Sequence, residues 1–184
     1  KTYTLVSATN IVNRGAIFNM EQKINVHWSW FTRIVTILVS LVFARIIWEE
    51  FKDFQANSLN RGVLLYVIFF ILISVVFAIN APISVRLTPQ YFELRKLVGR
   101  IRIEYTTITH VVRYKPSFWD MRVFGSGGFF GYIGFFQGNE IGRYSGFFAD
   151  TNQAFLIRTK RGKLYVFSTE APDRTVEELK KRIQ

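Results

Sequence analysis

The feature that most limits the fold is an uncharged apolar segment at residues 63–79, VLLYVIFFILISVVFAI. With Gly62 and Asn80 added, a helix here is long enough to cross most of a bilayer. Each residue adds about 1.5 Å, and the hydrocarbon layer is about 30 Å thick. Apolar side chains fall on every face of this helix, which argues against an amphipathic surface helix. The segment therefore predicts a transmembrane helix over about 62–80.

A second spanning helix is predicted upstream, within WSWFTRIVTILVSLVFARIIWEEF at residues 28–51. The uncharged stretch between Arg33 and Arg45 is too short to span. Both arginines lie near the ends of the segment, however, where their side chains can reach the headgroups. Tryptophans at both ends match the aromatic belts of a spanning helix. An interfacial or buried soluble helix is the alternative, but the apolar helix that follows favours a span over about 30–48.

The distribution of charge predicts an orientation for this hairpin, which occupies residues 28–82. Its polar connection, EEFKDFQANSLNR, carries three acidic and two basic side chains. Residues 1–48 carry five basic and one acidic, and residues 83–184 carry seventeen basic and nine acidic. Because basic residues gather on the cytoplasmic side, both chain ends are expected in the cytoplasm. The sequence thus predicts a multi-pass protein of the cell inner membrane, with a cytoplasmic segment of unassigned role at 1–27.

The periodicity changes after the hairpin, and residues 83–184 predict a β domain. Charged and apolar residues alternate in GRIRIEY, as in a strand with one solvated face. The stretch AFLIRTKRGKLYVFST predicts a hairpin with strands at 154–159 and 163–168. A C-terminal amphipathic helix is predicted over about 173–183, with acidic residues in its first turns, basic residues in its last turn and one apolar stripe.

Glycine and phenylalanine dominate residues 122–150, RVFGSGGFFGYIGFFQGNEIGRYSGFFAD. A G-x-G-x-x-G phosphate loop is excluded because Phe130 stands where the third glycine belongs, and no G-K-[ST] follows. Low-complexity disorder is excluded because strand-like segments bound the tract and its aromatics are spaced irregularly. The remaining interpretation is β-structure, with strands in GYIGFFQ and RYSGFFAD, in which glycines allow bends or close packing. The glycines predicted to be structural are Gly125, Gly127, Gly128, Gly131 and Gly134.

This order of motifs resembles the bacterial pleckstrin-homology (PH)-like domain family. The similarity lies in FGSGGFFGYIG, the hairpin FLIRTKRGKLYVFST, the helix entry APDRTVEELKKRI and the earlier IEYTTITHVVRY. The resemblance covers about residues 83–184. It implies a seven-stranded, strongly bent β-sandwich or partly open barrel capped by one helix, and attachment to a membrane hairpin is common among relatives. An α+β membrane protein is therefore expected, with little implied about activity, because such folds host many binding roles.

Residues for catalysis or cofactor binding are scarce. The chain has no cysteine and two histidines, which excludes thiolate metal sites and argues against a histidine-based zinc site. His110 is expected to be a sheet residue, and Ser126 lies outside a G-x-S-x-G motif. Asp120, Glu140 and Asp150 are expected to cap turns or to face solvent. The sequence therefore predicts no enzyme, no catalytic residue, no metal site and no cofactor.

Three basic residues form a candidate ligand site. Lys96, Arg100 and Arg102 fall across a predicted hairpin turn, at a spacing similar to that of phosphoinositide-binding PH domains, and together can clamp a phosphorylated headgroup. A solvated or juxtamembrane basic face is the interpretation favoured by the strand alternation. Nucleic acid is not expected as a partner, because the chain shows no recognised nucleic-acid-binding motif.

Two functional hypotheses follow. The first is a non-enzymatic, membrane-anchored cytoplasmic binding or assembly module, acting as an accessory subunit of a membrane complex. Its partners would be the lipid bilayer and either another protein or a second copy of the chain. Phe124, Phe129 and Phe130 are its candidate partner-binding residues, with a place in the core as their alternative. The second is an anionic-lipid headgroup sensor that uses Lys96, Arg100 and Arg102.

Overall fold

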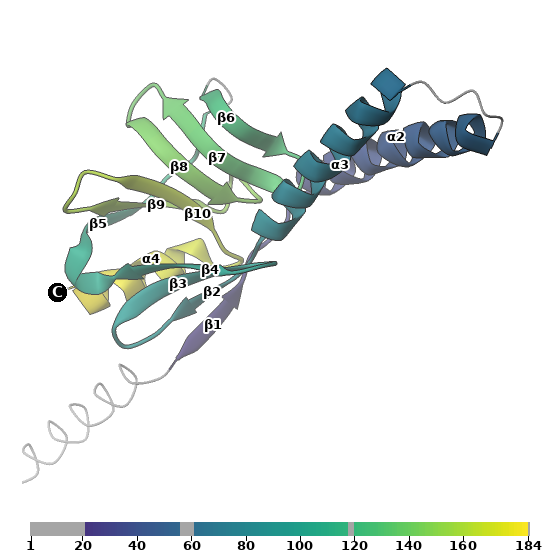
Figure 1. Cartoon of the computed structure of the whole chain (residues 1–184). Helices are drawn as coiled ribbons and strands as arrows, with labels where there is room; N and C mark the ends of the chain where they lie inside the picture. The colour runs from purple at the N-terminus through teal and green to yellow at the C-terminus, as the bar shows by residue number, and fades with distance from the viewer. Residues whose placement is uncertain (1–20, 56–60, 118–119, 184) are drawn as a thin grey trace, which may run out of the picture.

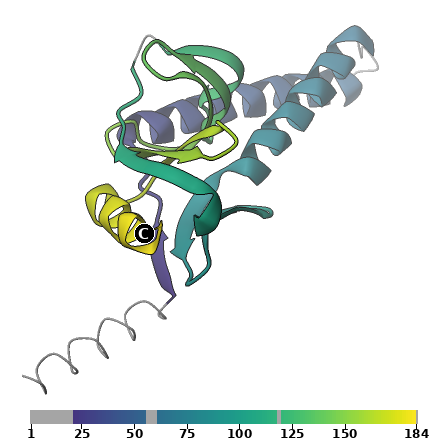
Figure 2. The same cartoon turned by 90° about the vertical axis from the view of Figure 1, so that its left-hand side faces the viewer.

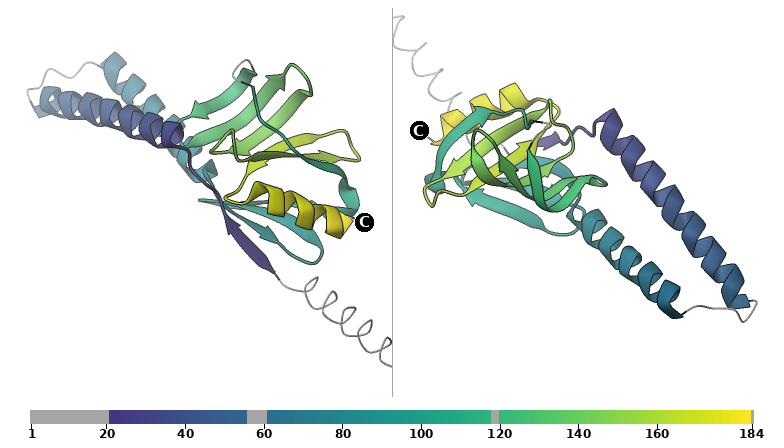
Figure 3. Two further views of the ribbon diagram at one scale, coloured as in Figure 1. Left: turned by 180° about the vertical axis from the view of Figure 1, so that it is seen from behind. Right: turned by 90° about the horizontal axis from the view of Figure 1, so that it is seen from above.

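The computed structural model describes residues 21–55, 61–117 and 120–183. Two long helices protrude together from a β-rich domain (Figures 1 and 3). In chain order the elements are β1 (Gln22–Asn25), α2 (Trp30–Gln55), α3 (Arg61–Asn80), β2 (Pro82–Leu87), β3 (Tyr91–Lys96), β4 (Arg100–Glu104), the 3₁₀ turn η1 (Tyr105–Thr107), β5 (Ile108–Arg113), β6 (Met121–Gly128), β7 (Gly131–Gly138), β8 (Gly142–Phe148), β9 (Ala154–Thr159), β10 (Leu164–Ser168) and α4 (Pro172–Ile183).

Helices α2 and α3 are long and apolar enough to cross a membrane, over Trp30–Lys52 and Gly62–Asn80. Few of their side chains are buried by the rest of the protein. Large apolar residues such as Leu41 and Leu65 are therefore left exposed on the helix surface. A helix that is apolar on all faces and not covered by protein suits a lipid environment. The two helices correspond to those predicted from the sequence.

Helix α2 continues past the predicted end at about residue 48 and reaches Gln55. The first part of the expected polar connection is therefore helical. Glu49 explains the continuation, because its carboxylate lies 2.7 Å from the guanidinium of Arg45 and 3.5 Å from the ammonium of Lys52. Pairs at these helical spacings stabilise a helix, and neither glycine nor proline interrupts it. Residues 56–60 of the connection lie outside the described part of the chain.

The smaller sheet includes a strand that the sequence analysis left unassigned. Its order is β1–β2–β3–β4, and every neighbouring pair is antiparallel. Strand β1 pairs with β2, with Lys23 opposite Arg86. The helical hairpin is therefore inserted between two adjacent strands of one sheet, and the β domain includes residues on both sides of it. The four residues of β1 are too few to give a strand pattern that sequence analysis recognises.

The larger sheet has the order β5–β9–β10–β8–β7–β6, and only β8 and β10 are parallel neighbours. The hairpin predicted at 154–159 and 163–168 is confirmed as β9 and β10. The two strands predicted within the glycine-phenylalanine tract are β7 and β8. Strand β6 forms one edge of this sheet, so its outer side has no strand partner among the described residues.

The two sheets face each other across an apolar core. Phe92 of the smaller sheet has its ring centroid 6.1 Å from that of Phe155 and 4.8 Å from that of Phe167 in the larger sheet. Helix α4 packs against β5 and contributes the buried Val176 and Leu179 to the same core, as its apolar stripe predicts. Figure 2 shows α4 lying beside the strands.

The sheets do not close into a barrel, and the α+β fold with an open, sandwich-like β domain is as predicted. The strand count differs from the seven that the resemblance implied, since the described residues form four strands in one sheet and six in the other. Part of the difference is β1, which the chain supplies from before the helical hairpin.

Candidate functional site: a groove beside helix α3

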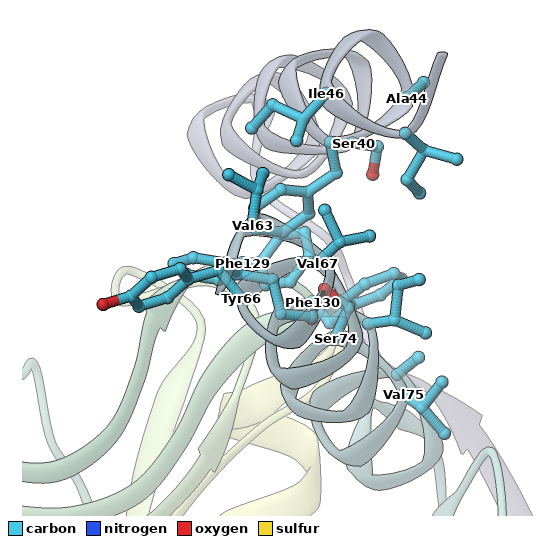
Figure 4. Close-up of a pocket in the computed structure, with 15 residues that line it drawn as sticks. Ser40, Ala44, Ile46, Val63, Tyr66, Val67, Ser74, Val75, Phe129 and Phe130 are labelled. Atoms are coloured by element: carbon cyan, nitrogen blue, oxygen red, sulfur yellow. Dashed lines mark hydrogen bonds between the residues drawn. The ribbon is translucent and has the colours of Figure 1, made fainter. Parts of the chain in front are cut away.

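The turn between β6 and β7 packs against the helical hairpin. The ring centroid of Phe129 lies 6.0 Å from that of Phe43 in α2 and 6.4 Å from that of Phe77 in α3. The backbone N–H of Phe130 donates to Thr36 Oγ1 at 3.0 Å. A cavity of about 490 Å³ between the helices is lined by both phenylalanines and by apolar helix residues (Figure 4). The turn thus fixes the β domain relative to α2 and α3.

Two glycines allow β6 and β7 to approach closely. Gly125 and Gly134 are opposite one another in the ladder, with φ of +129° and +135°. A Cβ on Gly125 would collide with the carbonyl oxygen of Ile133, and a Cβ on Gly134 with that of Phe124. Few residues with a side chain adopt such φ values, so both positions require glycine on two grounds.

The other three predicted glycines also lie close to neighbouring atoms. A Cβ on Gly128 would lie 3.2 Å from the ring of Phe31 in α2, and one on Gly131 would lie 3.1 Å from a backbone oxygen of β8. Gly127 has no positive φ, but its Cβ would collide with the guanidinium of Arg122. The close approach of backbone and side chains explains why this tract is rich in glycine.

A groove of about 930 Å³ lies between the larger sheet and the end of α3. Its volume is within the range of small-molecule binding sites. Strands β7, β8 and β10 form its floor, while α3 and β4 form the facing wall. The floor includes Phe135, Ser145, Phe147 and Tyr165, and the wall includes Val76, Phe77, Asn80 and Ile101.

The groove exists because the smaller sheet covers only part of the larger one. Inward side chains of β5, β9 and β10, such as Val111, Ile157 and Phe167, are buried against the smaller sheet. The same face of β7 and β6 lacks this cover at Phe135 and Phe124, although Ile133 and Ser126, nearer the β6–β7 turn, are buried. Phe135 is accordingly 59% exposed and Phe124, its partner across the ladder, is 74% exposed. An uncovered aromatic surface therefore continues from the core to the edge of the sheet.

The core supports the floor of the groove. The rings of Phe147 and Tyr165 stack on the fully buried ring of Phe167, at centroid distances of 6.3 and 6.0 Å. Buried aromatic packing of this kind holds side chains in fixed positions. The floor is therefore a preformed surface on a rigid element.

Two cations lie at the end of the groove furthest from the helices. Arg143 is the second residue of β8, and Lys163 immediately precedes β10. Both side chains are exposed and line the groove. Strand β8 runs from Arg143 toward Ala149, whose carbonyl oxygen accepts bonds from Ser29 N–H and Thr32 Oγ1–H at the start of α2. The cations therefore lie at the far end of the strand from the helical hairpin.

Residues 83–183 match the family described as bacterial PH domain. The chain belongs to the bacterial PH domain family. The match confirms the resemblance drawn from the glycine-rich tract and the hairpin that follows it. No curated protein and no solved structure matches the chain. Because one fold hosts many binding roles, the ligand of this PH domain has to be argued from its own surface.

In this PH domain, protein groups already occupy the predicted headgroup clamp. Arg102 Nε donates to Glu93 Oε2 at 2.7 Å, and Arg100 lies 3.8 Å from the same oxygen. The hydrogen bond to Glu93 raises the pKa of Arg102 above its ordinary value. Lys96 Nζ donates to Asn80 Oδ1 at 2.7 Å, at the end of α3. The three residues lie on neighbouring strands, but Glu93 offsets part of their charge.

The three phenylalanines predicted to bind a partner lie in two separate places. Phe129 and Phe130 are half-buried in the turn beside α2 and α3. Phe124 is on β6, exposed, and lines the groove. Of the three, only Phe124 is largely exposed to a partner at the groove.

Asp120, which was expected to cap a turn or to face solvent, is half-buried and accepts bonds from two side chains. Its carboxylate accepts hydrogen bonds from Tyr144 at 2.8 Å and from Tyr114 at 3.2 Å. Burial raises the pKa of both phenols, and the bonds to Asp120 raise it further. These tyrosines therefore remain protonated donors, and Asp120 serves to hold them in place.

Asp150 caps a turn as expected, accepting from the backbone N–H of Asn152 at 2.8 Å, but it is also buried and bonded to another side chain. Its second oxygen lies 2.8 Å from His27 Nδ1. Glu140 and His110 are exposed, in a turn and on a strand respectively. Within the described residues, no group of three or more acidic or histidine side chains is placed to hold a metal ion.

Arg143, Lys163 and the groove between them and α3 were not predicted from the sequence. One signal was present, since Arg143, Ser145 and Phe147 alternate on one face of β8. The parallel pairing of β8 with β10 brings Lys163 and Tyr165 close to this face of β8. Parallel pairing joins segments that no local pattern connects.

Proposed function

We propose that this chain is a non-enzymatic, membrane-anchored binding module of the bacterial inner membrane. Helices α2 and α3 would cross the bilayer, with the PH domain and both chain ends in the cytoplasm. The length and apolar surface of the two helices support the anchor. The excess of basic residues on both sides of the hairpin supports the orientation.

The observation that carries the binding role is the groove beside α3. It combines a volume of about 930 Å³ with an aromatic floor that is supported by the core and left uncovered. An exposed apolar surface of this kind on a rigid element marks a binding site. In this proposal the site, which lies next to α3, would be where the domain meets the membrane.

A non-enzymatic role is supported by what two carboxylates of the β domain do. Asp120 accepts bonds from two tyrosines, and Asp150 bonds to a histidine and a backbone N–H. General acid or base catalysis requires a titratable group that is free to reach a substrate. These carboxylates hold neighbouring groups in place instead.

The headgroup-sensor hypothesis is the weaker alternative. Its clamp of Lys96, Arg100 and Arg102 faces Glu93, whose side chain is 4% exposed and which binds Arg102 directly. A phosphate at this position would lie close to a buried carboxylate that it would repel.

An assembly role is the second candidate, with a protein partner or a second copy of the chain on β6. It is favoured by the edge position of β6 and by the exposed Val123 and Phe124 on this strand. Exposed apolar edge strands are surfaces on which other chains pair. The two candidates differ in what lies against Phe124 and Phe135.

Photo-crosslinking in native membranes tests the proposed function. The full chain would carry p-benzoylphenylalanine at Phe135, inside the groove, or at Val112, exposed on the opposite edge strand β5. The binding role predicts adducts at Phe135 and few at Val112, measured as mass shifts of the purified protein. Equal labelling at both positions, or none at Phe135, would contradict it.

A further inference from the structure

We infer that the groove holds one acyl chain of an anionic amphiphile drawn from the adjacent leaflet, with its headgroup bound between Arg143 and Lys163. The inference rests on the proposed function and specifies the ligand of the same groove. Four features of the groove support it: its two ends, its polar groups and its direction relative to the membrane.

With α3 crossing the bilayer as proposed, one end of the groove would open at the depth of the hydrocarbon. Val76 and Phe77 line it, and α3 ends at Asn80. Val76 lies one helical turn before that end, which is about 6 Å along the helix axis. An acyl chain in the leaflet beside α3 can therefore enter the groove sideways without crossing a polar barrier.

The other end of the groove is cationic. Arg143 and Lys163 lie two residues before Ser145 and Tyr165, which are paired in the parallel β8–β10 ladder. Both cations line the groove just beyond these paired residues, Arg143 within β8 and Lys163 immediately before β10. Neither forms an ion pair with another described residue. A single carboxylate or phosphate can bind both through charge-assisted hydrogen bonds.

The polar groups between these ends are too few for a peptide. Asn80 and Tyr144 line the groove, but Asn80 bonds to Lys96 and to a helix carbonyl, and Tyr144 bonds to Asp120. Only the hydroxyls of Ser145 and Tyr165 lack a partner among the described residues along the floor. An extended peptide brings an N–H and a C=O with every residue, and burying them unpaired is costly. An acyl chain has no such groups.

The direction of the groove matches that of a lipid in the leaflet. Its apolar end is at α3, and its cationic end, at Arg143 and Lys163, is close in sequence to the β7–β8 and β9–β10 turns. Figure 1 shows these turns on the side of the domain away from the helices. A lipid that moves partly out of the leaflet, parallel to its acyl chain, would place its headgroup at Arg143 and Lys163 while the end of its acyl chain remained near Phe77. No inversion of the molecule is required.

The test uses the full chain in phosphatidylcholine nanodiscs, with p-benzoylphenylalanine at Phe135. One set contains a minor fraction of oleic acid, a second contains lysophosphatidic acid, and a third contains lysophosphatidylcholine as the zwitterionic match. Intact mass spectrometry after illumination measures which amphiphile is attached. We expect the two anionic amphiphiles, or one of them, to label the protein about tenfold more than the zwitterionic one.

Charge reversal identifies the headgroup site. The double variant Arg143→Glu with Lys163→Glu should remove most of the anionic preference. Lys160→Glu with Arg161→Glu is the matched control, because it makes the same change of charge in the neighbouring β9–β10 turn outside the groove and should keep the preference. Circular dichroism would establish that both variants are folded.

Two results of these experiments would overturn the inference, and one further result in native membranes would do the same. The first two are equal labelling by anionic and zwitterionic amphiphiles, and loss of the preference in both double variants. Protein adducts without lipid adducts in native membranes would also overturn it, while the binding role stood. An absence of any adduct at Phe135 in native membranes would contradict the proposed function itself.

Discussion

Gly125 and Gly134 face each other across the β6–β7 ladder so closely that the Cβ of either residue would lie 2.8 Å from the Cα of the other. The two backbones therefore approach too closely for any side chain at either position, while the turn that follows packs beside α2 and α3. On the other side of β7, Gly134 is opposite Gly146 of β8, against which the ring of Phe136 packs. A row of three glycines therefore crosses the sheet where its neighbours need space.

Gly134→Ala should lower the free energy of unfolding by more than about 2 kcal/mol, because the new methyl group meets both a positive φ and a backbone carbonyl. Thermal unfolding of the full chain in detergent micelles measures the change. Gly162→Ala is the control, since Gly162 also has a positive φ but open space around it. Equal losses of Tm in the two variants would show that close packing at Gly134 has no part in the effect.

Thr36→Val should loosen the attachment of the domain to α2. The variant keeps the shape of the side chain but removes the acceptor of the Phe130 N–H, a bond worth about 1 kcal/mol. Amide hydrogen exchange at Phe130 should become faster, while exchange in β9 stays unchanged. Thr36→Ser retains the hydroxyl and should exchange at the wild-type rate. Unchanged protection at Phe130 in the valine variant would argue against this bond as the attachment.

Arg102→Met separates a structural role from headgroup binding. It leaves the nearly buried carboxylate of Glu93 without its 2.7 Å partner, and should lower the Tm. Arg100→Met, at 3.8 Å from the same carboxylate, should lower it less. Neither change should alter binding to vesicles that contain anionic lipid. If both variants lost vesicle binding at unchanged Tm, the headgroup-sensor hypothesis would be the better one.

Local periodicity was enough to predict α3, α4 and the β9–β10 hairpin, because the residues that decide each element are close together in the chain. It also indicated that the glycines from Gly125 to Gly134 are structural, because they allow bends or close packing of the strands. The groove was not predictable in this way. It depends on Tyr165 lying beside Ser145 through a parallel pairing, and on α3 ending beside β4. The bond between Arg102 and Glu93 was missed for a related reason, since their register across β3 and β4 follows from the turn rather than from either strand alone.

Alkaline pH should weaken the fold partly through Tyr105. Burial raises the pKa of this phenol from 10.0 to about 12. The unfolded chain therefore releases the proton first, and the contribution to stability is complete below pH 10 and is lost as the pH rises toward 12. Tyr105→Phe should flatten this part of the decline. Thermal unfolding at about pH 9 and about pH 11.5 measures it, and an equal decline in the two proteins would contradict the assignment.

Both the proposed function and the proposed ligand require that α2 and α3 cross the inner membrane with the groove on the cytoplasmic side. The chain has no cysteine, so a single introduced cysteine can be labelled without background. Ser58→Cys, in the connection, should react with a membrane-impermeant maleimide in intact cells with a permeable outer envelope. Thr151→Cys, in the β domain, should react only after the inner membrane is disrupted. Labelling of Thr151→Cys but not Ser58→Cys in intact cells would reverse the orientation, and labelling of both would contradict the anchored hairpin.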